Sequence, residues 1–225
     1  MAFAKACAHL KVVEKSSVAV MGFNSPEWAI SFSGGIMYNC VNTGIYLTNA
    51  PEACLYQVEH SEAEVVVVEN VEMLNRFIKS GKDEIKRVKA FVVYGEKKLP
   101  AEVSDNRVYH WTDFLKLGKD IPNDVIIEKC LRQKPGECCV LIYTSGTTGK
   151  PKGCMLSHDN LSWGTIGVME IASREKPDLI GPGNRTVSYL PLSHIAGLLF
   201  DLMSHYFNAH EIYFARSDAL QGSLV

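Results

Sequence analysis

The sequence lacks any apolar run close to the ~20 residues that a membrane-spanning helix needs. Its N-terminus, MAFAKACAHLKVVEK, is too short and too charged for a signal peptide and reads as the end of an amphipathic helix. Any membrane contact is therefore expected to be peripheral. The net charge is only −2 and the lysines and arginines are scattered, so the charge distribution gives no reason to expect nucleic-acid binding.

The sequence also lacks a Cys-x-x-Cys pair and any paired carboxylates that would suit general acid–base chemistry. We therefore predict no metal site and assign no catalytic residue. Buried, reduced thiols are favoured over zinc or disulfide sites. Reduced thiols indicate a cytosol-facing compartment. We expect a cytoplasmic protein, and peripheral attachment to the endoplasmic reticulum or another intracellular membrane stays open. The seven cysteines are Cys7, Cys40, Cys54, Cys130, Cys138, Cys139 and Cys154.

A chain of 225 residues with 47% hydrophobic and 21% charged residues suits one large domain or two small ones. Apolar, β-branched segments alternate with helical patterns, which predicts an α/β fold with a doubly wound, mostly parallel sheet and flanking helices. Met155 is expected in the core, and Trp163 is expected to be a packing residue rather than a residue that stacks on a cofactor. Strands are predicted at 18–23, 65–68, 88–94, 138–143, 154–156, 186–190 and 211–215. Helices are predicted at 26–39, 51–60, 73–79, 111–117, 122–132, 159–173 and 195–207.

Three N-cap residues are predicted from the start signals of these helices. Ser25 is a favoured N-cap residue, and Pro26 after it suits the first position of the helix. Asn49 gives the same signal before a second helix, and Asp159 is the expected cap of the helix that follows the 154–156 strand. Residues 95–133 show a weaker order and are the nearest candidate for a domain boundary.

The most informative segment runs from Tyr143 to Gly153 and reads YTSGTTGKPKG. Glycines let backbone amides turn toward a ligand, and successive amides in such a turn form an anion-binding concavity. Hydroxyl groups add donors and lysine adds a compact positive charge. The combination suits a polyphosphate. It differs from a Walker A loop because Gly149-Lys150 is followed by proline rather than Ser or Thr.

This segment resembles the phosphate-binding signature of the adenylate-forming ligases, the superfamily of acyl-CoA synthetases, luciferases and peptide-synthetase adenylation domains. The stretch SYLPLSHIAG, at 188–197, is similar to the next motif of that superfamily, in which a strand ends in a histidine beside the acyl site. Three further stretches, FNSPEW (23–28), GIYLTN (44–49) and FARSDALQGSL (214–224), look closest to bubblegum-type long-chain acyl-CoA synthetases.

The resemblance implies a two-step reaction. A long-chain fatty acid and ATP give an acyl-adenylate and pyrophosphate, and coenzyme A then displaces AMP to give acyl-CoA. Mg²⁺ would accompany the triphosphate, because shielding its charge permits attack by an anionic carboxylate. Lys152 looks like the lysine that the superfamily retains, whereas Lys150 reads as a solvated charge. The expected ATP-binding residues are Thr144, Ser145, Gly146, Thr147, Thr148, Gly149, Lys150, Pro151 and Lys152.

His194 is the expected substrate-binding residue. It follows a Pro-Leu-Ser turn at a strand end, where ligands gather in α/β sheets. Taken alone, a histidine in this place is more often structural. The surrounding motif favours a position that lines the acyl or ATP pocket.

Complete ligases of the superfamily are more than twice as long as this chain. We therefore expect residues 1–225 to be part of the large N-terminal AMP-binding domain, truncated at both ends, without the C-terminal lid domain. Long-chain fatty acid–CoA ligation is then the activity of the parent. Two alternatives stay open: activation of another carboxylic acid, and a non-catalytic nucleotide-binding or interaction fragment.

Residues 1–225 alone should not produce acyl-CoA, because the sequence contains no adenine-binding segment like that of the superfamily and no catalytic lysine of the lid domain. The measurement is AMP and palmitoyl-CoA release from the purified chain with ATP, palmitate, Mg²⁺ and coenzyme A. Turnover within tenfold of an ordinary enzyme rate of ~10 s⁻¹ would contradict the prediction.

Overall fold

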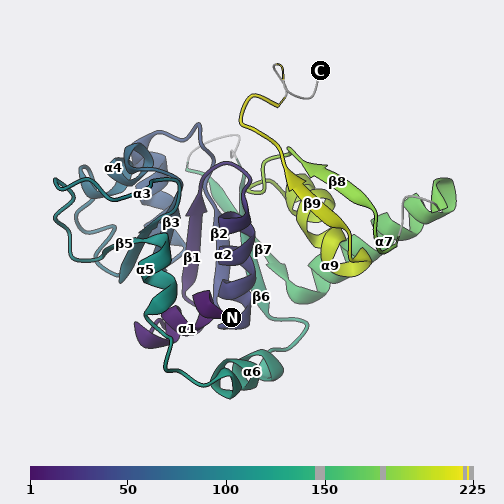
Figure 1. Ribbon diagram of the computed structural model, residues 1–225, viewed down its shortest axis with the longest axis horizontal. Coiled ribbons are helices and arrows are strands. Elements are labelled where there is room, and N and C mark those ends of the chain that lie inside the picture. The colour runs from purple at the N-terminus through teal and green to yellow at the C-terminus, as the bar shows by residue number, and fades with distance from the viewer. Residues whose placement is uncertain (145–149, 178–180, 220–221, 223–225) are drawn as a thin grey trace.

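The computed structural model describes residues 1–144, 150–177, 181–219 and 222. A seven-stranded sheet with the order β5-β4-β3-β1-β2-β6-β7 is the larger of its two sheets (Figure 1). Neighbouring strands run parallel except for β6 and β7, which are antiparallel. The strands are β1 (Ser17–Met21), β2 (Val41–Gly44), β3 (Ala63–Val68), β4 (Ala90–Val93), β5 (Val108–His110), β6 (Cys138–Thr144) and β7 (Lys152–Ser157).

Helices cover both faces of this sheet. In β1, Val18 and Val20 belong to a core shared with α1, α2 and α5, whereas Ala19 and Met21 belong to a core shared with α3 and α4. Successive side chains of a strand point to opposite faces, so a strand covered on both sides needs apolar residues throughout. The predicted doubly wound, mostly parallel fold is confirmed. The helices are α1 (Ala2–His9), α2 (Pro26–Met37), α3 (Pro51–His60), α4 (Val71–Ile78), α5 (Trp111–Lys116) and α6 (Asn123–Arg132).

The second sheet is a parallel pair of strands, β8 (Arg185–Ser188) and β9 (Glu211–Phe214), that lies beside the first (Figure 1). The long helix α7 (His158–Glu175) follows β7. Between β8 and β9 the chain forms α8 (Ile195–Gly197), the π-helix η2 (Leu198–Met203) and α9 (Ser204–Asn208). The sequence predicts one continuous helix here. The structure interrupts it with a π-helical segment, a rare conformation that is frequent at functional sites.

Two strands of the large sheet escaped prediction. β2 has the sequence VNTG, and asparagine and glycine are depleted in strands. It is nevertheless buried, with Asn42 only 2% exposed, because β1 and β6 pair with its two edges. β5 has only three residues and lies in the weakly patterned stretch 95–133. Tertiary pairing, rather than local propensity, makes both segments strands.

Of the three predicted N-caps, only one is correct. The Ser25 side chain accepts a hydrogen bond from the Trp28 amide, as expected for the cap of α2. The cap of α7 is Ser157 instead of Asp159, and that of α3 is Ala50 instead of Asn49. Ala50 provides no side-chain bond, so α3 starts from the fixed φ of Pro51 rather than from a polar cap.

Three side chains on β7 and α7 are more exposed than predicted, and they belong to Cys154, Met155 and Trp163. Met155, predicted in the core, is 68% exposed, and Trp163, predicted to be a packing residue, is 76% exposed. β7 is an edge strand of the sheet, so it has a neighbouring strand on one side only, and Leu161 and Thr165 are the buried residues of α7. All seven cysteines are free; six are buried or half-buried, and Cys154 on β7 is exposed.

Among the described residues, none of the helices has both the length and the apolar character that a bilayer crossing requires.

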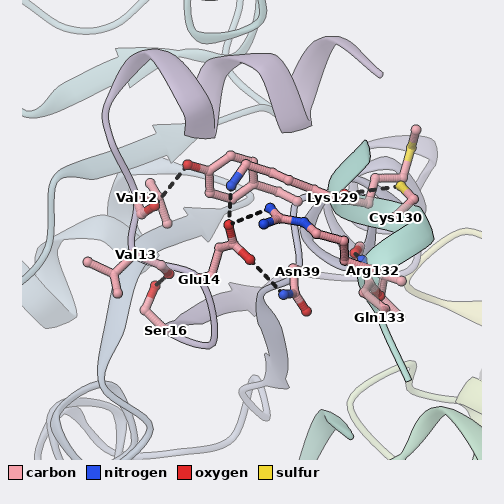
Figure 2. Close-up of polar contacts among 12 residues, drawn as sticks. Val12, Val13, Glu14, Ser16, Asn39, Lys129, Cys130, Arg132 and Gln133 are labelled. Atoms are coloured by element: carbon pink, nitrogen blue, oxygen red, sulfur yellow. Dashed lines mark hydrogen bonds and ion pairs between the residues drawn. The ribbon is translucent and has the colours of Figure 1, made fainter. Parts of the chain in front are cut away.

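A network of polar contacts around Glu14 holds α6 against the turn after α2 (Figure 2). The Glu14 carboxylate accepts hydrogen bonds from Lys129 and from the Asn39 side chain, the latter at 2.8 Å, and lies 3.4 Å from Arg132. Lys129 Nζ also lies 4.7 Å from the centroid of the Tyr38 ring. These contacts lower the pKa of Glu14 from its ordinary value of 4.5, chiefly through the hydrogen bond from Lys129.

Replacing Lys129 with methionine should lower the free energy of unfolding by about 1 kcal/mol at neutral pH. A carboxylate whose pKa is lowered by folding contributes its full stability above the unfolded pKa and loses it as the pH falls through the folded pKa. The deficit of Lys129→Met should therefore be largest above about pH 5 and should shrink toward about pH 3. Urea unfolding across this range measures it. The control is Lys116→Met, which removes an exposed pair with Asp113. An equal deficit in both variants would contradict the prediction.

Candidate functional site

The predicted phosphate-binding loop connects β6 to β7. The antiparallel register pairs Thr144 with Lys152, so the chain leaves the sheet at one of these residues and returns at the other. Thr144, Lys150 and Lys152 have exposed side chains, and Pro151 is half-buried. The predicted ligands Ser145, Gly146, Thr147, Thr148 and Gly149 lie outside the described residues. The described part therefore consists of the two ends of the loop, which carry two lysines and one hydroxyl group.

His194 is the N-cap of α8, and its side chain is exposed. Its Nδ1 accepts a hydrogen bond from the Ala196 amide at 3.1 Å, and its own backbone amide donates to the Pro191 carbonyl at 2.9 Å. Because Nδ1 acts as an acceptor, the neutral ring carries its proton on Nε2. The local turn thus fixes both the orientation of the ring and its tautomer.

A cavity of about 430 Å³ brings these two predicted regions together. Thr144 and Pro151, from the two ends of the loop, line it together with His194. The carboxyl ends of β2 and β6 lead directly into this cavity, the position where parallel α/β sheets bind ligands. The other lining residues are Tyr46, Thr48, Asn49, Gln57, Ile142, Tyr143 and Ile195.

The wall formed by residues 46–49 was not predicted as part of the site. This segment follows β2, and Arg76 holds it by donating to the carbonyls of Leu47 (2.8 Å) and Asn49 (2.9 Å). The Asn49 side chain donates to Gln57, which is only 2% exposed, at 3.3 Å. The only signal in the sequence was the stretch GIYLTN, whose similarity to acyl-CoA synthetases pointed to no role.

Gly44, at the end of β2, brings this wall against the segment that carries His194. A Cβ atom at position 44 would lie 2.5 Å from the Cα of Ser193, so a side chain would push the two backbones apart. Glycine is the residue that permits such a close approach. The end of β2 and the His194 turn consequently form one continuous wall.

Tyr143, which lines the cavity from β6, is held by two neighbouring rings. The Tyr143 hydroxyl lies 2.8 Å from His60 Nδ1, and the Tyr56 ring packs edge-on against the Tyr143 ring. Burial raises the pKa of Tyr143 to about 12, with a smaller contribution from Tyr56, so its hydroxyl stays neutral at physiological pH. Lys150 is exposed, as expected for a solvated charge, and its Nζ also lies 4.9 Å from the centroid of the Tyr56 ring. Such cation–π contact restrains an exposed lysine.

Comparison with known proteins identifies relatives over the whole chain. The family model of the AMP-binding enzymes matches residues 1–224. The chain is 42% identical over 228 residues to the long-chain-fatty-acid–CoA ligase ACSBG2 of Gallus gallus, covering 99% of this chain and 28% of the relative. It is 40% identical over 222 residues to ACSBG1 of Homo sapiens, covering 99% of this chain and 30% of the relative. The chain thus spans about a third or less of the length of these relatives.

Solved structures share the fold at low sequence identity. The anthranilate CoA ligase AuaEII, in complex with anthranoyl-AMP, superimposes with a TM-score of 0.76 at 20% identity, covering 99% of this chain and 40% of that structure. A putative long-chain-fatty-acid CoA ligase from Rhodopseudomonas palustris gives a TM-score of 0.70 at 16% identity, covering 97% of this chain and 49% of that structure. With the family model matched from end to end and bubblegum-type relatives at about 40% identity, the chain belongs to the AMP-binding enzyme family.

Proposed function

We propose that the chain is the part of a long-chain fatty acid–CoA ligase that supplies the phosphate-binding loop and one wall of the acyl site. The parent reaction joins a fatty acid to ATP, releasing pyrophosphate, and coenzyme A then displaces AMP from the acyl-adenylate. The observation that carries the proposal is the cavity lined by both ends of the loop and by His194. The similarity to long-chain-fatty-acid–CoA ligases supports the choice of substrate.

The residues of this chain act by positioning and by charge stabilisation. A carboxylate is already an adequate nucleophile, so the protein has to hold it in line with the α-phosphorus of ATP and stabilise the charge that develops on the phosphates. Lys152 and the Thr144 hydroxyl, at the two ends of the loop, are exposed and available to the β and γ phosphates. These groups match a polyphosphate in charge and in hydrogen-bonding character.

His194 orients the reacting groups as a hydrogen-bond donor. Its Nδ1 is engaged by the Ala196 amide, which leaves the Nε2 proton for an oxygen of the substrate carboxylate or of the α-phosphate. A donor held by its own backbone turn does not have to reorganise during the reaction. His194 therefore belongs to the substrate-binding wall and takes no proton in this scheme.

Mg²⁺ and coenzyme A are the remaining participants of the proposed reaction. Mg²⁺ would enter with the triphosphate and supply charge shielding for attack by an anionic carboxylate. Among the described residues there is no group of three or more His, Cys, Asp or Glu side chains that could hold a metal ion. We propose a cytoplasmic location for the protein, supported by its free cysteines, with any membrane contact peripheral.

The test of this function uses a chimera in which residues 1–225 replace the matching part of the Gallus gallus relative. Lys152→Ala should slow palmitate-dependent ATP–pyrophosphate exchange about a hundredfold, because a donor to developing charge is worth ~3 kcal/mol in the transition state. The affinity for palmitate should change little. Lys119→Ala, at an exposed position beside α5, is the matched control.

The outcomes separate the candidate functions. Exchange that depends on palmitate supports the long-chain ligase, and exchange only with a shorter or aromatic acid indicates that another carboxylate is activated. If the chimera shows no exchange but residues 1–225 bind tripolyphosphate, the chain is a non-catalytic phosphate-binding module. If Lys152→Ala exchanges pyrophosphate at the unaltered rate, Lys152 has no role in the adenylation step.

A further inference from the structure

The stretch FNSPEW, at residues 23–28, has no part in the site as described so far. It begins directly after β1, and the Phe23 peptide is held from both sides. Its amide donates to Glu69 Oε2 at 2.8 Å, and the Tyr94 hydroxyl donates to its carbonyl at 3.2 Å. A Cβ at Gly22 would lie 1.9 Å from the Tyr94 hydroxyl oxygen, so only glycine fits next to this contact. Asn24 therefore projects from a fixed backbone.

The Asn24 side chain is only 5% exposed, and all of its hydrogen bonds reach one distant segment. Nδ2 donates to Ser188 Oγ at 2.8 Å and to the Leu190 carbonyl at 2.7 Å, which uses both of its hydrogens. Oδ1 accepts from the Leu192 amide at 3.2 Å. The partners are 164 to 168 residues away in sequence, and they form the end of β8 and the turn before His194.

The same turn is fixed from its other side by Asp201 in η2. Asp201 is 7% exposed, and its Oδ2 accepts from the amides of Tyr189 (2.8 Å) and Leu190 (2.9 Å). The backbone of the turn also touches Gly44, as described above. Contacts from the segment after β1, from the end of β2 and from η2 thus meet on residues 188–193, directly before the substrate-facing histidine.

We propose that Asn24 is a positioning residue of the adenylation reaction: it sets the position of the His194 turn relative to the phosphate loop. The proposal rests on the proposed function, in which His194 orients the reacting groups. β6 and β1 both belong to the first sheet, whereas His194 follows β8 of the second sheet. The Asn24 hydrogen bonds join the two sheets and therefore control the distance between His194 and Thr144 at the end of β6. A displacement of about 1 Å in such a geometry can cost a hundredfold in rate.

Asn24→Asp is the decisive variant because it keeps the size of the side chain and the acceptor for Leu192. It replaces the donor with a carboxylate oxygen that faces the Leu190 carbonyl oxygen. These two oxygens repel each other, so the contact becomes unfavourable instead of being only weakened. Ser188→Ala is the milder second variant, since it removes one of the three bonds. The matched control is Asn70→Ala, which removes one side-chain hydrogen bond at the start of α4 and does not alter a residue that lines the cavity.

The first measurement does not depend on catalysis. In residues 1–225, Asn24→Asp should shift the His194 ring resonances and lower the hydrogen-exchange protection of the Leu192 amide at least tenfold. Ser188→Ala should cause a smaller change in the same direction, and Asn70→Ala should leave both signals in place. Unaltered His194 resonances and Leu192 protection in Asn24→Asp would overturn the proposal that Asn24 fixes the turn.

The second measurement uses the chimera described above. Asn24→Asp should lower kcat for palmitate-dependent pyrophosphate exchange at least tenfold while KM for ATP stays within twofold, and Asn70→Ala should match the parent. A purely structural role predicts no difference between the effects on kcat and on KM. It would be indicated by an equal loss of kcat in Asn70→Ala, or by an unchanged kcat in Asn24→Asp. If the unaltered chimera has no exchange activity, the proposed function fails and the role in the reaction fails with it, whereas the first measurement still decides whether Asn24 fixes the turn.

Discussion

The parallel pairing of β1 with both β2 and β3 is the constraint on which the rest of the structure depends. Because these strands run in one direction, the chain emerges from all of them at the same edge of the sheet. That edge holds the Phe23 peptide, the wall at residues 46–49 and Glu69. Asn24 joins the second sheet to this edge through three hydrogen bonds, one with the Ser188 hydroxyl and two with the backbone of Leu190 and Leu192. The cavity exists because the two sheets are joined there.

Sequence reasoning succeeded where a pattern is local. The β-branched run at 65–68 predicts a strand buried on both faces, and Ser25 before Pro26 predicts the start of α2; both are confirmed. It failed where partners decide the conformation. VNTG is a poor strand sequence that becomes a strand only between β1 and β6. Met155 reads as a core residue, yet nothing among the described elements covers its side of the edge strand, and it is exposed.

The candidate site shows the same division. The loop sequence and the SHIAG histidine can be recognised as motifs, because their chemistry is written in consecutive residues. Their meeting in one cavity cannot be read from the sequence, since it depends on Gly44 touching Ser193 and on Asn24 reaching across 164 residues. Gln57 and Arg76 give no sequence signal at all. Each is defined by what it contacts: Gln57 by the Asn49 amide, and Arg76 by the carbonyls of Leu47 and Asn49.

The antiparallel return of β7 has a consequence for how tightly the loop can hold a ligand. Thr144 and Lys152 form the last pair of the β6–β7 ladder, so the ladder sets the length of the loop between the two strands. If this pair opens, the connection between the paired strands lengthens from residues 145–151 to 144–152, and the change in loop-closure entropy is small. In the proposed function, a polyphosphate that contacts both ends of the loop favours the closed pair. Affinity for the phosphate and stability of the sheet edge are therefore thermodynamically linked, and ligand binding should strengthen the strand on which the loop is mounted.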